Sequence, residues 1–263
     1  MELTGKVAVV TGGASGLGRA TVEAYVARGV QVAIFDLNEQ AAVELVAALG
    51  EDRAAFWKVN VADEDSVRGA IAGVVGRFGA LHICNNFAGI ASASRTFGKE
   101  GVFPLDVFTG VLNVNLVGTF NVCRYAAEQM AGNDPVGAEA GRGVIINTAS
   151  IAAYEGQVGQ VAYSASKGGI VAMTLPMARD LAACGIRVNT IAPGLVRTPL
   201  IDTLPAAAYR SLEAQVLYPQ RLGRPEEIAH LSVFIAGNDY LNDVCIRLDG
   251  GIRMQPGERA GRG

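Results

Sequence analysis

Tyr163 and Lys167 form a pair that could move a proton. They stand four residues apart in the segment Tyr163-Ser-Ala-Ser-Lys167, so a helix would place both side chains on one face. A free phenol has a pKa of about 10, too high for a base near neutrality, but a neighbouring ammonium would favour the phenolate. Ser150 precedes this segment and could hold a substrate oxygen against the phenol. These residues predict an alcohol or ketone site, although a surface tyrosine and a core-edge serine would give the same pattern.

A glycine-rich turn offers a second site, suited to phosphate. The run Thr11-Gly12-Gly13-Ala14-Ser15-Gly16-Leu17-Gly18 lies between a strand pattern and a helix pattern. Glycines there let the backbone approach a pyrophosphate, and the helix N-terminus supplies N–H groups. Asp36 ends the next strand pattern, where a carboxylate binds ribose hydroxyls and repels a 2′-phosphate. The sequence predicts NAD rather than NADP as the cofactor. The positive nicotinamide ring of NAD would also favour the Tyr163 phenolate. The alternative is that Asp36 only caps the following helix.

Alternating strand and helix patterns must position these residues. Apolar strand patterns lie at 6–11, 30–36, 54–59, 81–85, 143–147, 186–191 and 244–248. Helical patterns lie between them at 15–28, 38–49, 63–78, 104–130, 161–183 and 225–236. This alternation predicts an α/β fold: a single doubly wound Rossmann-type domain, with a parallel seven-stranded sheet and helices on both faces.

Residues 1–256 are expected to form this one NAD-binding and catalytic domain. Two stretches, 91–103 and 195–220, break the alternation. We expect the second, which is proline-containing and apolar, to cover the substrate. Residues 257–263 are expected to form a disordered tail.

Composition narrows the classes of function. The 263 residues carry a formal net charge of −3, which argues against a nucleic-acid surface. Two histidines cannot build a histidine-rich metal site, and four cysteines without a C-x-x-C pair fit a reducing compartment. The N-terminus lacks the order of a signal peptide, and the uncharged run 107–123 is too short and too polar to span a bilayer. We expect a cytoplasmic protein without a metal, nucleic-acid or membrane partner.

These motifs together resemble the short-chain dehydrogenase/reductase family. The resemblance rests on the glycine-rich run, Asn115 in N-V-N-L, Ser150 and Y-S-A-S-K, and extends over nearly the whole chain. Within the family, segments 143–150, 155–160, 163–171 and 246–256, with an insertion at 92–102, are similar to the type II 3-hydroxyacyl-CoA dehydrogenases. The resemblance implies an NAD-dependent homotetramer of fatty-acid metabolism that interconverts (3S)-3-hydroxyacyl-CoA and 3-oxoacyl-CoA.

The resemblance also implies roles for single residues. Tyr163 would be the catalytic acid/base, and Lys167 would lower its pKa and bind the nicotinamide ribose. Ser150 would bind the reacting oxygen, and Asn115 would hold a water that relays protons to Lys167. Gln157 and Gln160 would border the substrate, with Ser150 and Tyr163. The implied cofactor contacts are Gly12, Ser15, Gly16, Leu17, Gly18, Asp36, Asn60, Val61, Phe87, Ala88, Gly89, Tyr163, Lys167, Pro193, Gly194, Val196 and Thr198.

Three positions depart from the family pattern. Asn60 stands where the family usually has Asp, although an amide oxygen can still accept a bond from the adenine amino group. Phe87 replaces a small or polar residue, so its cofactor contact would be through the backbone. Arg197 adds a charge near the substrate mouth, which fits a solvated loop better than a contact to a CoA phosphate.

Other functions remain compatible with the sequence. The apolar stretch 195–220 could equally cover a steroid or another secondary alcohol. A 3-oxoacyl-carrier-protein reductase would usually prefer NADPH, which Asp36 disfavours. A non-catalytic NAD-binding scaffold would not need Tyr163, Lys167 and Ser150, yet all three are present.

Overall fold

Seven parallel strands form the centre of the molecule. The computed structural model describes residues 1–99, 101–135, 137, 139–198 and 205–257. Its large sheet has the order β3-β2-β1-β4-β7-β8-β9, and all neighbouring strands pair in parallel. The strands are β1 (Val7–Thr11), β2 (Gln31–Asp36), β3 (Ala54–Lys58), β4 (Ile83–Asn86), β7 (Gly143–Thr148), β8 (Ile186–Pro193) and β9 (Cys245–Leu248). The predicted fold class is confirmed.

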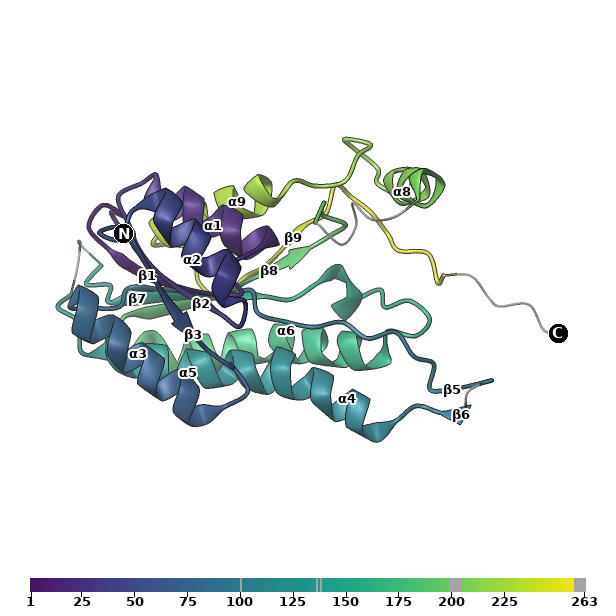
Figure 1. Ribbon diagram of the computed structural model, residues 1–263, viewed down its shortest axis with the longest axis horizontal. Helices are drawn as coiled ribbons and strands as arrows, with labels where there is room; N and C mark the ends of the chain where they lie inside the picture. Colours follow the sequence, from purple (N-terminus) through teal and green to yellow (C-terminus); the bar gives the residue numbers. More distant parts are fainter. Residues whose placement is uncertain (100, 136, 138, 199–204, 258–263) are drawn as a thin grey trace.

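Helices cover both faces of this sheet, as Figure 1 shows. One face carries α1 (Gly16–Val26), α2 (Glu39–Leu49) and α9 (Pro225–Gly237), which bury Tyr25, Leu45 and Ile235 against the strands. The other face carries α3 (Glu64–Phe78), α5 (Gly118–Ala131) and α6 (Val161–Ala182), with a second buried cluster. Because both faces of the central strands are buried, β1, β2 and β7 are mostly continuous apolar runs rather than alternating ones.

The stretch predicted as one helix over 104–130 consists of three consecutive elements. α4 (Leu105–Leu112) leads into a π-helical turn, η1 (Asn113–Val117), and then into α5. Such turns insert one residue into a helix and often mark functional sites. The buried residue of η1 is Asn115.

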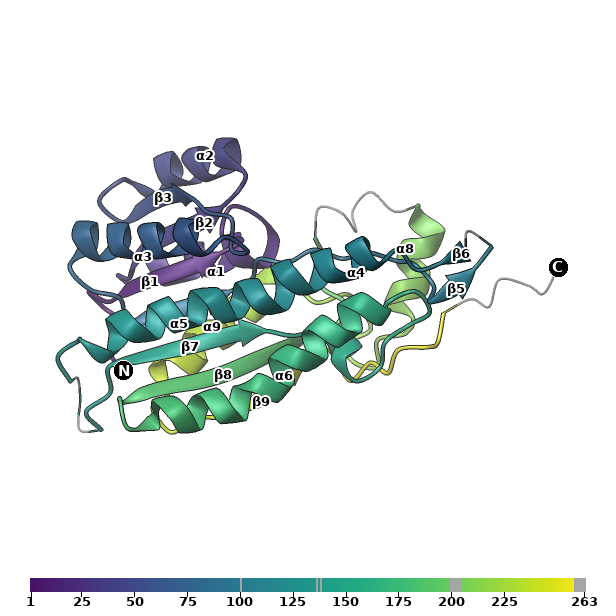
Figure 2. The same ribbon diagram turned by 90° about the horizontal axis from the view of Figure 1, so that it is seen from below.

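By length and composition alone, the helix Leu105–Ala131 could cross a membrane. Its most apolar window has a mean hydropathy of 1.2, and 33% of that window is buried inside the fold. The uncharged run 107–123 is only part of this helix, whose bounds agree closely with the helical pattern predicted at 104–130. In Figure 2 the helix lies along the sheet between α3 and α6, as a structural layer of the domain.

Both stretches that broke the alternation contain short elements that the sequence did not predict. The first holds the antiparallel strands β5 (Phe97–Gly98) and β6 (Gly101–Val102), and the second holds α8 (Ala206–Glu213). Strands of two residues are too short to leave a periodic pattern. Both lie at the end of the molecule toward which the strands point (Figure 1). Residues 199–204 of the second stretch and 258–263 of the predicted tail lie outside the described residues.

Candidate active site and cofactor cleft

A cleft of about 570 Å³ lies over the carboxyl ends of β1, β2 and β4. It brings together most of the residues expected to contact the cofactor. Its lining comprises Gly12, Ser15, Gly16, Leu17, Gly18, Phe35, Asp36, Leu37, Val59, Asn60, Val61, Phe87, Ala88, Gly89, Ile90, Val114 and Thr198. This is the point where the strand order reverses, between β1 and β4, and open α/β sheets bind ligands at such points.

Three glycines of the glycine-rich turn disfavour a side chain, two because of tight packing and one because of its backbone conformation. A Cβ on Gly18 would collide with the carbonyl oxygen of Gly12, and one on Gly12 would lie 3.0 Å from the nitrogen of Ala88. Gly16 has a φ of +51°, and a Cβ built there meets no atom within 4 Å. The turn therefore presents bare backbone to the cleft at the start of α1, a surface that fits a pyrophosphate.

Asp36 is fixed at the end of β2 by two backbone groups. Its Oδ2 accepts the N–H of Ala14 at 3.0 Å, and its Oδ1 accepts the N–H of Asn38 at 2.9 Å. The side-chain cap of α2 is Asn38, whose Oδ1 accepts the N–H of Ala41 at 3.2 Å. The alternative that Asp36 is only a helix cap is therefore wrong. The carboxylate lines the cleft beside the exposed, uncharged Leu37.

Asn60 and Phe87 of the cleft wall differ in what their side chains do. The Oδ1 of Asn60 accepts the N–H of Ala62 at 3.1 Å, so one acceptor position of the amide is already used. The backbone N–H of Phe87 donates to Thr11, while its ring packs against the buried cluster of α1 and α9. The prediction that Phe87 offers only backbone to a cofactor is consistent with this packing.

Ser150, Tyr163 and Lys167 gather beside the cleft. Ser150 and Tyr163 are joined by a side-chain hydrogen bond. Lys167 is buried, donates from Nζ to the carbonyl oxygen of Thr148 at 2.7 Å, and lies 5.8 Å from the centre of the Tyr163 ring. A Cβ on Gly89, which lines the cleft, would lie 3.7 Å from this Nζ. The group expected to do chemistry thus adjoins the site expected to hold the cofactor.

Burial acts on the two titratable groups in opposite directions. It raises the pKa of Tyr163, and the hydrogen bond with Ser150 offsets this only in part. It lowers the pKa of Lys167 to about 8. The expected lowering of the Tyr163 pKa included the positive nicotinamide ring, and in the protein without a cofactor the pKa is raised instead. Burial disfavours the phenolate more than the neighbouring groups stabilise it.

Asn115 connects the cleft wall to the helix of Tyr163. Its Oδ1 accepts the N–H of Ile90 at 2.8 Å, and its Nδ2 donates to the carbonyl oxygen of Ile90 at 2.9 Å and to Ser166 Oγ at 3.0 Å. Ser166 Oγ in turn donates to the carbonyl oxygen of Tyr163 at 2.7 Å. Sequence reasoning missed Ser166, although it stands inside the Tyr163–Lys167 segment.

Gln157 and Gln160 do not line the cofactor cleft. They line a separate hollow of about 480 Å³ beside residues 94–97. The N–H of Gln157 donates to Gln160 Oε1 at 2.9 Å, and Gln157 Nε2 donates to the carbonyl oxygen of Gln255 at 2.8 Å. Both amides therefore hold the loop that follows Ser150.

Pro193, Gly194 and Val196 also lie outside the lining of the cofactor cleft. Pro193 ends β8, and a Cβ on Gly194 would lie 2.6 Å from that of Asp249. Val196 is buried and forms an isolated bridge with Gly223. Asp249 and Gly223 thus pack against the backbone after β8. Thr198 is the residue of this segment that lines the cofactor cleft.

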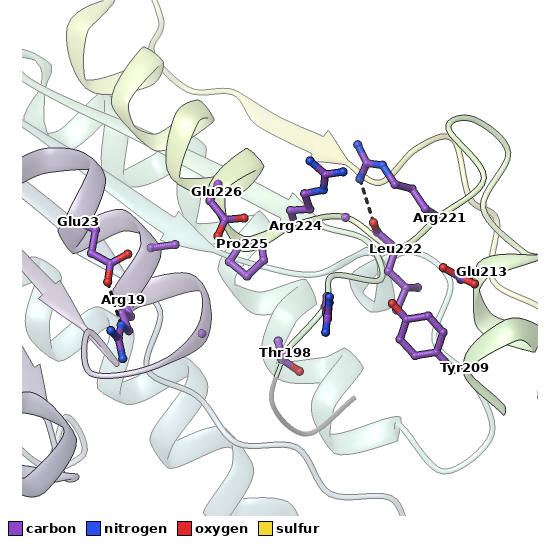
Figure 3. A pocket seen from close by; sticks show the side chains of 14 residues that line it. Arg19, Glu23, Thr198, Tyr209, Glu213, Arg221, Leu222, Arg224, Pro225 and Glu226 are labelled. Carbon is purple, nitrogen blue, oxygen red and sulfur yellow. Dashed lines mark hydrogen bonds and ion pairs between the residues drawn. The ribbon is translucent and has the colours of Figure 1, made fainter. Parts of the chain in front are cut away.

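Arg197 lines a neighbouring cleft of about 560 Å³, which shares Gly16 and Thr198 with the first (Figure 3). Four arginines line it together with three glutamates. Arg19 pairs with Glu23 at 2.9 Å within α1. Because charges of both signs are interspersed there, this cleft is not a strongly cationic surface.

Comparison with known proteins agrees with this geometry. Residues 6–208 match the short chain dehydrogenase family. The chain is 53% identical over 258 residues to the 3-hydroxyacyl-CoA dehydrogenase type-2 of Homo sapiens, covering 97% of this chain and 98% of that protein. It is 34% identical to a 3-oxoacyl-acyl-carrier-protein reductase of Thermotoga maritima, with 96% and 99% covered.

A solved structure is similar as well. The crystal structure of 3-hydroxyacyl-CoA dehydrogenase type-2 from Mycobacterium avium has a TM-score of 0.92 and 40% identity to this chain, covering 96% of this chain and 98% of that one. Enzymes of this family typically use a nicotinamide cofactor on small-molecule substrates. The chain belongs to the short-chain dehydrogenase family and is an oxidoreductase.

Proposed function

We propose that this protein interconverts (3S)-3-hydroxyacyl-CoA and 3-oxoacyl-CoA, with NAD as the hydride carrier. The observation that carries the proposal is the bonded pair of Ser150 and Tyr163, with Lys167 5.8 Å from the phenol ring, beside a cleft that contains Asp36. The proposed substrate follows the name of the 53% identical relative. The relative named as a carrier-protein reductase is less similar, at 34% identity.

The residues of the cleft fit NAD better than NADP. Asp36 holds its carboxylate at the end of β2, where it would accept bonds from two ribose hydroxyls. The same negative charge would repel a 2′-phosphate, and Leu37 offers no compensating cation. Gly12, Gly16 and Gly18 would hold the pyrophosphate through backbone N–H groups.

When bound, NAD would supply the hydride acceptor of the oxidative direction. Ser150 would hold the substrate hydroxyl against Tyr163, whose phenolate takes the hydroxyl proton. General base catalysis of this kind contributes about 10²–10⁴-fold, and correct positioning contributes much of the remainder. Because burial raises the pKa of Tyr163, the phenolate would need positive charge nearby, which Lys167 would supply from 5.8 Å away. The proton would then leave Tyr163 by way of Lys167 and a water held at Asn115, so that Lys167 keeps its positive charge.

The test is an assay of NADH absorbance with acetoacetyl-CoA, a panel of steroid ketones and both reduced cofactors. We expect NADH to be consumed with acetoacetyl-CoA, with a preference over NADPH of at least about tenfold in kcat/KM. Turnover with NADPH alone would contradict the role of Asp36. If the enzyme reduces a steroid ketone but not acetoacetyl-CoA, the proposed substrate is wrong and a steroid takes its place.

The proposed working form is a homotetramer in the cytoplasm. Val117, Phe120, Val161 and Leu175 are exposed apolar side chains on η1, α5 and α6. Large apolar side chains grouped on one surface are typical of interfaces between subunits. Light scattering coupled to gel filtration would give four times the chain mass of 27.3 kDa, and a monomer would contradict this proposal.

A further inference from the structure

One arginine joins the two loops that flank the candidate active site. Arg247 on β9 donates to Glu155 Oε1 at 2.7 Å, to Asp249 Oδ2 at 2.8 Å and to the carbonyl oxygen of Ile252 at 3.2 Å. Arg253 makes longer ion pairs with the same two carboxylates, at 3.4 and 3.8 Å. The two arginines and two carboxylates form one cluster, which we call the Arg247 cluster.

Glu155 attaches this cluster to the loop that follows Ser150. The second oxygen of Glu155 accepts the N–H of Met254 at 3.0 Å. The contact continues along the carboxyl-terminal segment through two hydrogen bonds: Gln157 Nε2 to the oxygen of Gln255 at 2.8 Å, and the N–H of Val158 to the oxygen of Pro256 at 3.0 Å. The loop therefore packs against the carboxyl-terminal segment. The Arg247 cluster joins the two at Glu155, where their contact begins.

Asp249 attaches the cluster to the other side of the site. Its side chain is 9% exposed and lies directly behind the turn after β8, where a Cβ on Gly194 would approach it to 2.6 Å. The N–H of Gly194 donates to the oxygen of Leu248 at 3.0 Å. The turn at Gly194 leads to Thr198, which lines the cofactor cleft, so the cluster spans from the loop after Ser150 to the segment that reaches this cleft.

Apolar side chains connect the same parts of the chain as the Arg247 cluster. Ile151, Val216 and Ile252 form a small buried cluster, with Leu195 packed against it. Ile151 directly follows Ser150, while Leu195 and Val216 belong to the segment predicted to cover the substrate. Packing and ion pairs therefore connect the same three parts of the chain.

We infer that Arg247 is a positioning residue for the reaction. By holding Glu155 and Asp249 together, it sets the position of the loop 151–160 relative to the turn at Gly194. Ser150 directly precedes that loop, so the part of the substrate site that the loop forms depends on the Arg247 cluster. This inference rests on the proposed function for its substrate and for the role of Ser150.

The experiment compares Arg247→Met and Arg247→Lys with wild type and with Arg68→Met. Arg68 pairs with Asp65 at 2.6 Å on the exposed face of α3, so its variant is a matched loss of an ion pair away from the site. We measure KM and kcat with acetoacetyl-CoA, NADH affinity by fluorescence, and amide hydrogen exchange. For Arg247→Met we expect KM to rise about tenfold and kcat to change by less than about threefold.

Exchange should become faster in the peptide covering 150–161 of Arg247→Met and stay unchanged in the central strands. Arg247→Lys should recover most of the KM, and Arg68→Met should match wild type. Unchanged KM and exchange in Arg247→Met would overturn the inference. A parallel loss of kcat, NADH affinity and melting temperature would also overturn it, since that describes a purely structural role. If wild type reduces another ketone and ignores acetoacetyl-CoA, the proposed substrate fails, and the variants are compared with that ketone.

Discussion

At the residue scale, the proposed chemistry depends on two buried titratable side chains, Tyr163 and Lys167. Burial raises the pKa of Tyr163 and lowers that of Lys167 to about 8. The spacing of Tyr163 and Lys167 predicted that they share a helix face, and Ser150 was expected near them because it follows a strand end, where the sites of α/β sheets lie. It could not predict the direction of the Tyr163 shift, since desolvation depends on the packing around the phenol. Residue spacing also could not predict that the side chains of Gln157 and Gln160 form hydrogen bonds within their own loop and to the carboxyl-terminal segment.

Lys167→Met should shift the pH dependence of oxidation toward higher pH. Removing a positive charge 5.8 Å from the phenol ring makes the phenolate harder to form, and such a charge changes a pKa by about 1–3. The measurement is kcat for oxidation of 3-hydroxybutyryl-CoA across neutral and alkaline pH. A profile identical to that of wild type would show that Lys167 does not support the phenolate.

Asp36→Asn should weaken the preference for NAD. An amide keeps one of the two acceptors that bind the N–H groups of Ala14 and Asn38, and it removes the charge that repels a 2′-phosphate. Hydrogen bonds to charged groups are worth about 1.5–3 kcal/mol, so the ratio of kcat/KM for NAD over NADP should fall about 10–100-fold. The exposed Asp65→Asn on α3 is the control. An unchanged ratio would contradict the role given to Asp36.

At the element scale, most boundaries follow from local signals. Continuous apolar runs mark the strands, and Asn38 and Asp63 begin α2 and α3 by accepting N–H bonds, as their positions predict. The π-helical turn that carries Asn115 gives no such signal, because it depends on tertiary contacts with Ile90 and Ser166. The strands β5 and β6 are too short to predict.

His82, which directly precedes β4, should make stability depend on pH. Its Nδ1 accepts the N–H of Val7 at 3.2 Å, and burial lowers its pKa to about 4. The folded pKa is thus below the unfolded one of about 6.5. The contribution of His82 to stability is fully present above the pKa of the unfolded state. It is lost as pH falls toward the pKa of the folded state, because the unfolded chain binds the proton first.

We expect a loss on the order of 1 kcal/mol over this range, since partial exposure of the ring screens the effect. Urea unfolding at several pH values measures it. His82→Gln should flatten this dependence, whereas the exposed His230→Gln on α9 should preserve it. Equal slopes for all three proteins would exclude His82 as the cause.

At the scale of the whole molecule, the parallel sheet collects distant segments at one end. The loops after β1, β2, β4, β7 and β8 all open there, so the cofactor cleft and Tyr163 adjoin although they are far apart in sequence. Alternating patterns predicted this arrangement of parallel strands. The order β3-β2-β1-β4-β7-β8-β9 was not predicted, because it depends on which faces of the strands and helices pack together.

Phe120→Asp should break the proposed tetramer into smaller species. The side chain is half exposed on α5, and burying a charge without a partner at an interface is costly. Light scattering measures the mass, and Val43→Asp, at an equally exposed apolar position on α2, is the matched control. A full-mass tetramer in Phe120→Asp would place the subunit contact elsewhere.

The central claim is that Tyr163 is the acid/base of an NAD-dependent dehydrogenase. Its most direct test is NADH oxidation with acetoacetyl-CoA by wild type and Tyr163→Phe, with NADH affinity measured separately. The account predicts turnover by wild type and a loss of about 10²–10⁴-fold in kcat for Tyr163→Phe, with NADH affinity unchanged. Turnover by Tyr163→Phe within about tenfold of wild type would contradict it, because the proton would then move through another group.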